Sequence, residues 1–298
     1  MDEIDIAITK ELAADPRIAY RDLADKLSLS VNAVHKRIQL MVSKGIIAGF
    51  RIRLSPQVTG GGFLSLYGRS QSLDLTSTLE QLGSHPCTHR IIAAGGQFLY
   101  VDAFVRSNEE MQDFIAFVRE TGKMDELKTI VMVMFGPPPE KDPLTKTDYR
   151  IISSLSPDCR RPLQEVAEEI GSTYKTVKRR LENMEAQRQV YYAIDWVPSS
   201  SGDIVSMVHA KSRPTSSVKD IATAMINRKD PHILGISASN VEPGLLLFSM
   251  WARDLRELRD AEGSLNSNSD FESMYSNLFY DMRTFTTWID KTVADRAK

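Results

Sequence analysis

The chain of 298 residues repeats itself at a fixed interval, and this repeat constrains its fold more than any other feature. A shift of 143 positions lays Asp5 on Asp148 and Arg37 on Arg180 without a gap. The same shift matches Ile8 with Ile151, Leu12 with Leu155, Arg17 with Arg160, Val34 with Val177 and Met41 with Met184. Because a repeated segment folds as one unit, both halves are expected to share one architecture, and the length allows two to four compact units.

Composition excludes several classes of protein. Apolar residues make up 42% and charged residues 26%, which is ordinary for a globular protein. No apolar run reaches the ~20 residues that span a bilayer, and the acidic start of the chain does not resemble a signal peptide, so we expect a cytoplasmic protein without a membrane segment. The net charge of −2 means that any nucleic-acid contact must come from a local basic patch.

Each copy begins with three predicted helices. Apolar residues at Ile4, Ile8 and Leu12 form one stripe, and the Asp15-Pro16 pair ends that first helix. A short second helix follows, and a third begins after a capping residue, Ser30 in the first copy and Thr173 in the second. Residues 45–50 then read as a helix end leading into a β-hairpin wing, so each copy predicts a winged helix-turn-helix.

A β-rich segment with two helices follows each of these units. In the first half we expect strands at 63–69, 90–105 (a hairpin turning at Gly95-Gly96) and 127–135, with helices at 73–83 and 108–119. In the second half we expect strands at 204–210, 233–252 (a hairpin) and 283–289, helices at 218–226 and from 255, and an extra loop within 264–280. Both orders read βαββαβ. The proline-rich residues 136–143 predict a stiff linker between the halves, and residues 198–202 a looser one.

These residues resemble the Lrp/AsnC (feast/famine) family of transcriptional regulators. The resemblance rests on Asp5-x-x-Ile8, Ser30-x-x-x-Val34-x-x-Arg37-Ile38 and Gly45-Ile46-Ile47-x-Gly49-Phe50, and it extends over both halves. It implies an α+β fold in which tandem winged helix-turn-helix domains are each followed by a ferredoxin-like βαββαβ module, the RAM domain. The expected domains are residues 1–55 and 144–197 for the helix-turn-helix units, and 62–136 and 203–291 for the RAM-like modules.

The resemblance implies sequence-specific binding to double-stranded DNA through the third helix of each copy, whose outward side chains reach base edges in the major groove. Arg51 and Arg53 on the wing, with Lys44 beside it, are expected to contact phosphates. Arg37 and Arg180 have an alternative role, bracing the third helix against the first. The full set of predicted DNA-binding residues is Ser30, Asn32, His35, Lys36, Arg37, Arg51, Arg53, Thr173, Lys175, Lys178, Arg179 and Arg180.

The resemblance also implies assembly and small-molecule binding through the RAM-like modules. Gly95 and Gly96 match the family's glycine before the second hairpin strand, so a small effector such as an amino acid is expected there, while residues 237–240 leave this open for the second module. Within one chain the two modules should pack as a pseudo-dimer, and whole chains should oligomerise further. The second copy carries Arg188, Tyr192 and Asn183 where the first has Gly45, Gly49 and Leu40, which leaves its wing geometry open.

His85, Cys87 and His89 suggest a metal site, but no fourth ligand stands near them, so neither a metal nor a cofactor is predicted. The alternative from another class is an enzyme, because siroheme decarboxylases share the Lrp/AsnC-like architecture. Their signature, a histidine followed by an aromatic-rich hairpin, is not matched by His89 and the aliphatic residues 91–96, so a regulator rather than an enzyme is predicted. A third alternative is that one copy has lost DNA binding and serves assembly only.

Overall fold

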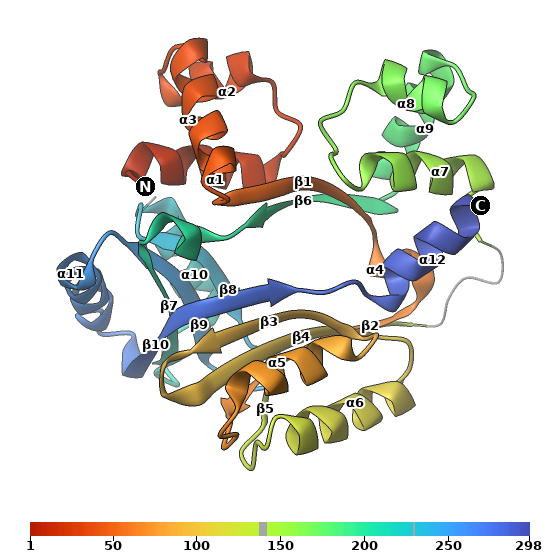
Figure 1. Cartoon of the computed structure of the whole chain (residues 1–298). Helices are drawn as coiled ribbons and strands as arrows, with labels where there is room; N and C mark the ends of the chain where they lie inside the picture. Colours follow the sequence, from red (N-terminus) through yellow and green to blue (C-terminus); the bar gives the residue numbers. More distant parts are fainter. Residues whose placement is uncertain (137–141, 229) are drawn as a thin grey trace.

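A computed structural model of the chain describes residues 1–136, 142–228 and 230–298 (Figure 1). The core of the predicted stiff linker, residues 137–141, lies outside the described residues. Within them, the fold is α+β, with helical units on one side of an antiparallel sheet. This confirms the predicted fold class. No described helix combines the length and apolar character needed to cross a membrane.

The two copies of the repeat fold into two three-helix units. Each helix of the second unit begins 143 positions after its counterpart, because the same caps and apolar stripes recur. The first unit comprises α1 (Glu3–Ala14), α2 (Tyr20–Leu27) and α3 (Val31–Ser43), and the second comprises α7 (Lys146–Leu155), α8 (Leu163–Glu169) and α9 (Tyr174–Ala186). The predicted core positions Val34, Ile38 and Met41 are buried in α3, as are their counterparts in α9. Both units lie on the same side of the molecule (Figure 1).

The predicted hairpin wing is wrong. After α3 the chain forms a single strand, β1 (Ile47–Leu54), and after α9 a single strand, β6 (Val190–Trp196). These two strands pair antiparallel with each other, and the register places Phe50 opposite Ile194 and Arg51 opposite Ala193. Residues 49–54 pair in one continuous register with residues 190–195, and a bulge between Ile47 and Gly49 interrupts the register at the start of β1. Each strand takes its backbone hydrogen bonds from the other copy, which sequence periodicity within one copy does not reveal.

The turn between α9 and β6 keeps the geometry of the first copy. Gly45 adopts a left-handed φ of 71°, and Arg188 at the equivalent position adopts 55°. A non-glycine residue pays about 1–2 kcal/mol for this conformation, since its Cβ crowds the following carbonyl oxygen. The second turn is therefore strained, yet its shape is preserved.

Replacing Arg188 by glycine should raise the free energy of unfolding by about 1 kcal/mol, because glycine adopts positive φ without the steric cost. Urea unfolding followed by circular dichroism measures this difference. Gly45→Ala is the matched control and should lower the free energy of unfolding by a similar amount. If Arg188→Gly proved neutral or destabilising, the turn would not be strained.

Each half continues into a βαββαβ module, as predicted. The first module comprises β2 (Gly61–Arg69), α5 (Leu75–Ser84), β3 (Thr88–Ala94), β4 (Phe98–Val105), α6 (Asn108–Thr121) and β5 (Lys128–Gly136). The second comprises β7 (Ile204–Ser212), α10 (Val218–Asn227), β8 (Ile233–Ala238), β9 (Leu245–Ala252), α11 (Leu255–Asn266) and β10 (Phe271–Thr284). Short helical turns, α4 (Pro56–Thr59) and η2 (Pro198–Ser201), lie just before β2 and β7.

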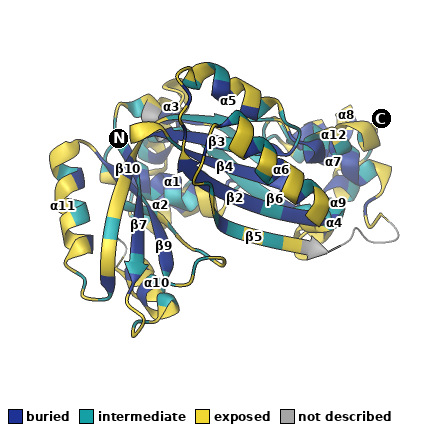
Figure 2. Cartoon of the chain, turned by 90° about the horizontal axis from the view of Figure 1, so that it is seen from below, coloured by how far each residue is buried: buried dark blue, intermediate teal, exposed yellow. Residues whose placement is uncertain are grey.

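The two modules join within the chain into one eight-stranded sheet of order β5-β2-β4-β3-β10-β7-β9-β8. The long strand β10 makes the junction, since residues 271–278 pair with β7 and residues 279–284 pair with β3. The faces of the two modules also meet, in a cluster that includes Tyr67, Tyr100 and Leu247. Seen from below, β2, β4 and β9 are largely buried, whereas much of β10 and the outer faces of α5 and α6 are exposed (Figure 2). The pseudo-dimer expected from the duplication is thus formed.

The C-terminal predictions need correction. The last strand is β10 rather than 283–289, and most of the stretch expected to be a loop, 264–280, belongs to α11 and β10. A helix absent from the prediction, α12 (Trp288–Ala297), follows it. Thr287 and Asp290 form a capping box that starts this helix, and the indole of Trp288 donates to the Phe104 carbonyl at 2.8 Å. The helix packs against α7 and so fastens the second helix-turn-helix unit to the sheet.

Candidate DNA-binding surface

The third helix of each unit begins at a side-chain cap. Ser30 accepts a hydrogen bond from the backbone N–H of Ala33, and Thr173 from that of Thr176, both at 3.2 Å. Ser30 and Thr173 therefore position the helix start, where the helix dipole favours a phosphate group. Side chains exposed on the N-terminal part of these helices are Asn32, His35 and Lys36 on α3, and Lys175, Lys178 and Arg179 on α9.

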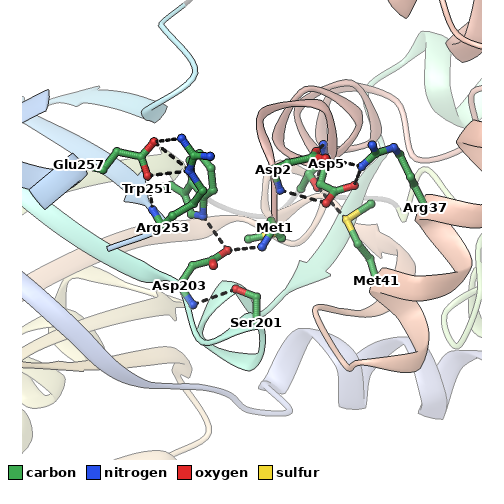
Figure 3. Close-up of polar contacts among 11 residues, drawn as sticks. Met1, Asp2, Asp5, Arg37, Met41, Ser201, Asp203, Trp251, Arg253 and Glu257 are labelled. Atoms are coloured by element: carbon green, nitrogen blue, oxygen red, sulfur yellow. Dashed lines mark hydrogen bonds and ion pairs between the residues drawn. The ribbon is translucent and has the colours of Figure 1, made fainter. Parts of the chain in front are cut away.

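Arg37 and Arg180 brace the third helix against the first. The Arg37 guanidinium lies 2.7 Å from an Asp5 oxygen and 2.8 Å from one of Asp2 (Figure 3). Arg180 makes the equivalent ion pair with Asp148 at 3.0 Å. The structure thus favours the alternative role of these two arginines, because ion pairing inside each unit directs them away from a ligand.

A reciprocal contact clasps the two units together. Arg160 of the second unit donates to the carbonyls of Pro16 and Ile18, at 2.6 and 3.0 Å. Its guanidinium also lies over the rings of Tyr20 and Phe50, at 4.6 and 5.3 Å from the centroids. Arg17, the counterpart of Arg160 in the repeat, donates in turn to the carbonyl of Cys159.

Together with the β1–β6 pairing, this clasp holds α3 and α9 in a fixed relation. The two loops that form it face each other between the helical units (Figure 1). A fixed relation between two reading helices sets the spacing of the DNA segments that they can contact.

Arg51 and Arg53 do not lie on a wing. Arg51 contacts Asp195 at 2.5 Å and donates to the Pro157 carbonyl at 2.6 Å. Arg53 lies between Asp195 and Asp290, at 3.4 and 3.5 Å. Both arginines therefore hold the β1–β6 ribbon against neighbouring elements. Their prediction as phosphate contacts depended on the hairpin wing, which the chain does not form.

The exposed faces of the two recognition helices differ in chemistry. On α9, Lys175, Lys178 and Arg179 supply positive charge, and Lys178 lies 3.8 Å from Glu182. On α3, Lys36 alone carries a formal positive charge on the corresponding part of the helix. The second unit is therefore the more basic reader, while the first presents amide and imidazole groups.

Gly95 and Gly96 lie in the exposed turn between β3 and β4. Gly96 has a φ of +65°, and a Cβ there would lie 3.1 Å from the Arg69 guanidinium. The conformation accounts for a glycine at this position, since other residues adopt it at a cost. A role for this turn in holding an effector stays a prediction.

His85, Cys87 and His89 have different surroundings. The His85 ring packs against Phe114 and Phe117, at 5.0 and 4.7 Å between centroids, and Cys87 is fully buried. His89 lies beneath the β1–β6 ribbon, where burial and the charges of Arg53 and Arg90 lower its pKa to about 4. Among the described residues its Nδ1 is buried without a hydrogen-bond partner.

A buried polar network between the modules was missed by sequence reasoning. His209, 1% exposed, contacts the hydroxyls of Tyr100 at 2.8 Å and Tyr275 at 3.0 Å. Asn277 donates to the same Tyr100 hydroxyl at 2.8 Å. The partners come from both halves of the chain, so no local pattern could have revealed them.

Comparison with known proteins agrees with this architecture. A family model described as winged helix-turn-helix DNA-binding matches residues 1–48, and one described as an AsnC-type helix-turn-helix domain matches residues 144–185. The regulator LrpA of Mycobacterium tuberculosis is 28% identical over 140 residues, which cover 45% of this chain and 92% of LrpA. The regulatory protein AsnC of Escherichia coli K12 is 28% identical over 133 residues, which cover 43% of this chain and 86% of AsnC.

Solved structures of one enzyme match the whole chain. The siroheme decarboxylase NirDL aligns over 99% of this chain and 98% of its own, with a TM-score of 0.58 and 13% sequence identity. At this identity the likeness concerns the fold. The paired helix-turn-helix matches, and relatives that each span about half of this chain, fit an internally duplicated Lrp/AsnC-like protein.

Proposed function

We propose that this protein is a sequence-specific, DNA-binding transcriptional regulator that reads DNA with two unlike recognition helices. One observation carries the proposal: α3 and α9 lie on the same side of the molecule, each begins at a side-chain cap, and the Arg17 and Arg160 contacts clasp their units together. Regulators that act as dimers obtain such a pair from two chains, whereas here one chain supplies both.

The residues proposed to touch DNA follow from exposure. Asn32, His35 and Lys36 of α3 and Lys175, Lys178 and Arg179 of α9 face away from the core. Asparagine suits adenine and lysine suits guanine acceptors, while lysine and arginine also contact phosphates. Arg37, Arg51, Arg53 and Arg180 are left out of this set because ion pairs within the chain hold them.

Further parts of the proposal extend what the relatives suggest. Double-stranded DNA is the proposed partner, and a cytoplasmic location is part of the same proposal. A small effector such as an amino acid is proposed to act near Gly95 and Gly96, and further assembly of whole chains is proposed through the RAM-like modules. The proposed helix-turn-helix domains are residues 1–55 and 144–197, and the proposed RAM-like domains are residues 62–136 and 203–291.

Replacing both Lys178 and Arg179 by alanine should flatten the salt dependence of DNA binding. Each lost phosphate contact reduces the slope of log K against log salt concentration by about 0.9, so the slope should fall by up to about 1.8. Fluorescence anisotropy with a labelled DNA duplex at several salt concentrations measures it. The control is Arg119→Ala with Lys219→Ala, which removes the same two residue types from exposed positions on α6 and α10. An unchanged slope in the first variant would remove α9 from the DNA.

The whole-chain likeness to NirDL makes a siroheme decarboxylase-like enzyme the second candidate. A related structure of that enzyme contains an iron-uroporphyrin III analogue. Titrating the purified protein with iron-uroporphyrin III and recording the visible absorbance tests this candidate directly. A saturable shift of the absorbance spectrum without salt-sensitive DNA binding would favour the enzyme. Salt-sensitive DNA binding without a spectral shift would favour the regulator.

A further inference from the structure

The eight-stranded sheet has two outer strands, β5 and β8, and their free edges differ. The edge of β5 is occupied by the turn that follows β8. Asn240 accepts a hydrogen bond from the Met132 N–H at 3.0 Å and donates one to the Met132 carbonyl at 2.7 Å. The Ser239 hydroxyl donates to the Ile130 carbonyl at 2.5 Å. These two side chains bond to the backbone of β5 as a neighbouring strand would, so this edge is closed to another strand.

The edge of β8 has no such cover among the residues that the structure describes. Gly235 to Ala238 pair with β9 in one register, and the N–H of Ser239, which follows them, donates to the Leu245 carbonyl. Because backbone groups alternate in direction along a strand, the N–H and C=O groups of Ile236 and Ala238 point away from β9. Within the described chain β9 is the one neighbour of β8 in the sheet, so these outward groups form an open strand edge.

The first module shows what fits an edge of this kind. Its strand β3 corresponds to β8 in the order of elements, and residues 279–284 of β10 cover the outer edge of β3 as an antiparallel strand. The strand that corresponds to β10, β5, instead stays paired with β2 as far as Gly136. Residues 137–139, which follow in the sequence, are prolines and have no N–H group to donate to a strand. The partner that suits β8 is therefore an antiparallel strand from another molecule.

The sequence of β8 lacks most of the features that keep edge strands apart in natural proteins. Lysine, proline or an inward-pointing charge commonly blocks pairing between such edges. Apart from a bulge between Ile233 and Gly235, β8 has none of these, since it reads Ile-Leu-Gly-Ile-Ser-Ala. Apolar side chains are also exposed nearby: Ile226 on α10, which packs against β8, and Val241 in the turn after β8. Two β8 strands can therefore pair without bringing like charges within the strands together.

We propose that two copies of this chain associate through β8, and that the two strands pair antiparallel across a two-fold axis. The second copy is the partner because β8 is the open edge of this sheet in each molecule, so the same edge meets itself and the assembly closes as a dimer. The inference deepens the further assembly that forms part of the proposed function, and it rests on that part alone. Such a dimer carries four helix-turn-helix units, so a two-fold symmetric DNA site can repeat the asymmetric site of one chain.

Sedimentation equilibrium of the full chain without DNA should show a dimer of twice the chain mass of 33.5 kDa, with a Kd on the order of 10 µM or tighter. Hydrogen exchange of the Ile236 and Ala238 amides should slow as the protein concentration rises, because pairing protects them.

Two variants of one residue test the edge itself. Ala238→Pro removes an outward N–H, which an edge strand tolerates within its own fold, and should weaken association by about tenfold or more. Ala238→Lys keeps the N–H but adds a charge to each strand, and should weaken association similarly, so the test does not depend on the proline variant alone. Ala116→Lys is the matched control, since it adds the same charge at an exposed position on α6.

Two results would overturn the proposal: an unaltered chain that stays monomeric up to about 200 µM, or a dimer that both Ala238 variants leave as tight as before. None of these measurements contains DNA. A dimer that binds no DNA would refute the proposed regulator and leave the β8 pairing intact. A monomer with salt-sensitive DNA binding would refute the β8 pairing alone.

Discussion

Between pH 7 and pH 5 the free energy of unfolding should fall by about 2 kcal/mol through His209 alone. Burial between the two modules, together with the charge of Lys128, lowers the pKa of His209 to about 4. In the unfolded chain the imidazole takes up a proton near pH 6.5, while in the folded protein it stays neutral until pH 4. The unfolded state therefore binds more protons in this window, and stability is lost as the pH falls.

His89 contributes in the same direction, because its pKa is also lowered to about 4. The share of His209 is isolated by His209→Gln, whose amide can still bond the Tyr100 and Tyr275 hydroxyls but takes up no proton. Urea unfolding at pH 7, 6 and 5 should show a drop that is smaller by about 2 kcal/mol in this variant.

His35→Gln serves as the control, because it makes the same change of residue type at an exposed position on α3. A variant His209→Gln that loses as much stability between pH 7 and pH 5 as the unaltered chain would show that His209 is not buried in its neutral form.

The helical units could be predicted well because their signals are local. The capping contacts of Ser30 and Thr173, and the apolar spacing in α3 and α9, involve residues only three or four positions apart in the sequence. Because the repeat presents each pattern twice, the second copy supports the prediction made from the first. The order of elements in the RAM-like modules followed from the same kind of pattern.

The predictions that were wrong concern elements whose structure depends on contacts between segments distant in the sequence. The β1–β6 pairing joins residues more than a hundred positions apart, so a lone strand looked like the start of a hairpin. The strand β10 was missed because its serines and asparagine resemble a loop in the sequence, although Phe271 and Asn277 are buried. For α12 a signal was present: Thr287 and Asp290 have the spacing of a capping box.

The candidate site shows the same division. Exposure of Asn32, His35, Lys175 and Lys178 follows from helix periodicity, and the structure agrees. The prediction that Arg51 and Arg53 contact phosphates assumed that they lie on a hairpin wing. In the structure they contact Asp195 and Asp290, which belong to the second half of the chain, so the sequence of the first half could not reveal these partners.

Asn32→Ala and Lys175→Ala should each weaken DNA binding by about 1–3 kcal/mol, but at different half-sites. The two residues occupy equivalent positions on α3 and α9. An asparagine side chain both donates and accepts hydrogen bonds, as adenine requires, whereas a lysine only donates, which suits the acceptors of guanine. Because the two helices read different base patterns, a base change in one half-site should abolish the effect of one variant and leave that of the other.

The most direct measurement is selection of the preferred site from a random double-stranded DNA library, followed by footprinting on the smallest bound fragment. The short fragment matters because assembly of several chains could restore a larger palindrome. If one chain reads DNA with two unlike helices, the minimal site contains two different half-sites, roughly one helical turn or a multiple of it apart. A minimal site made of two identical inverted half-sites would contradict the account.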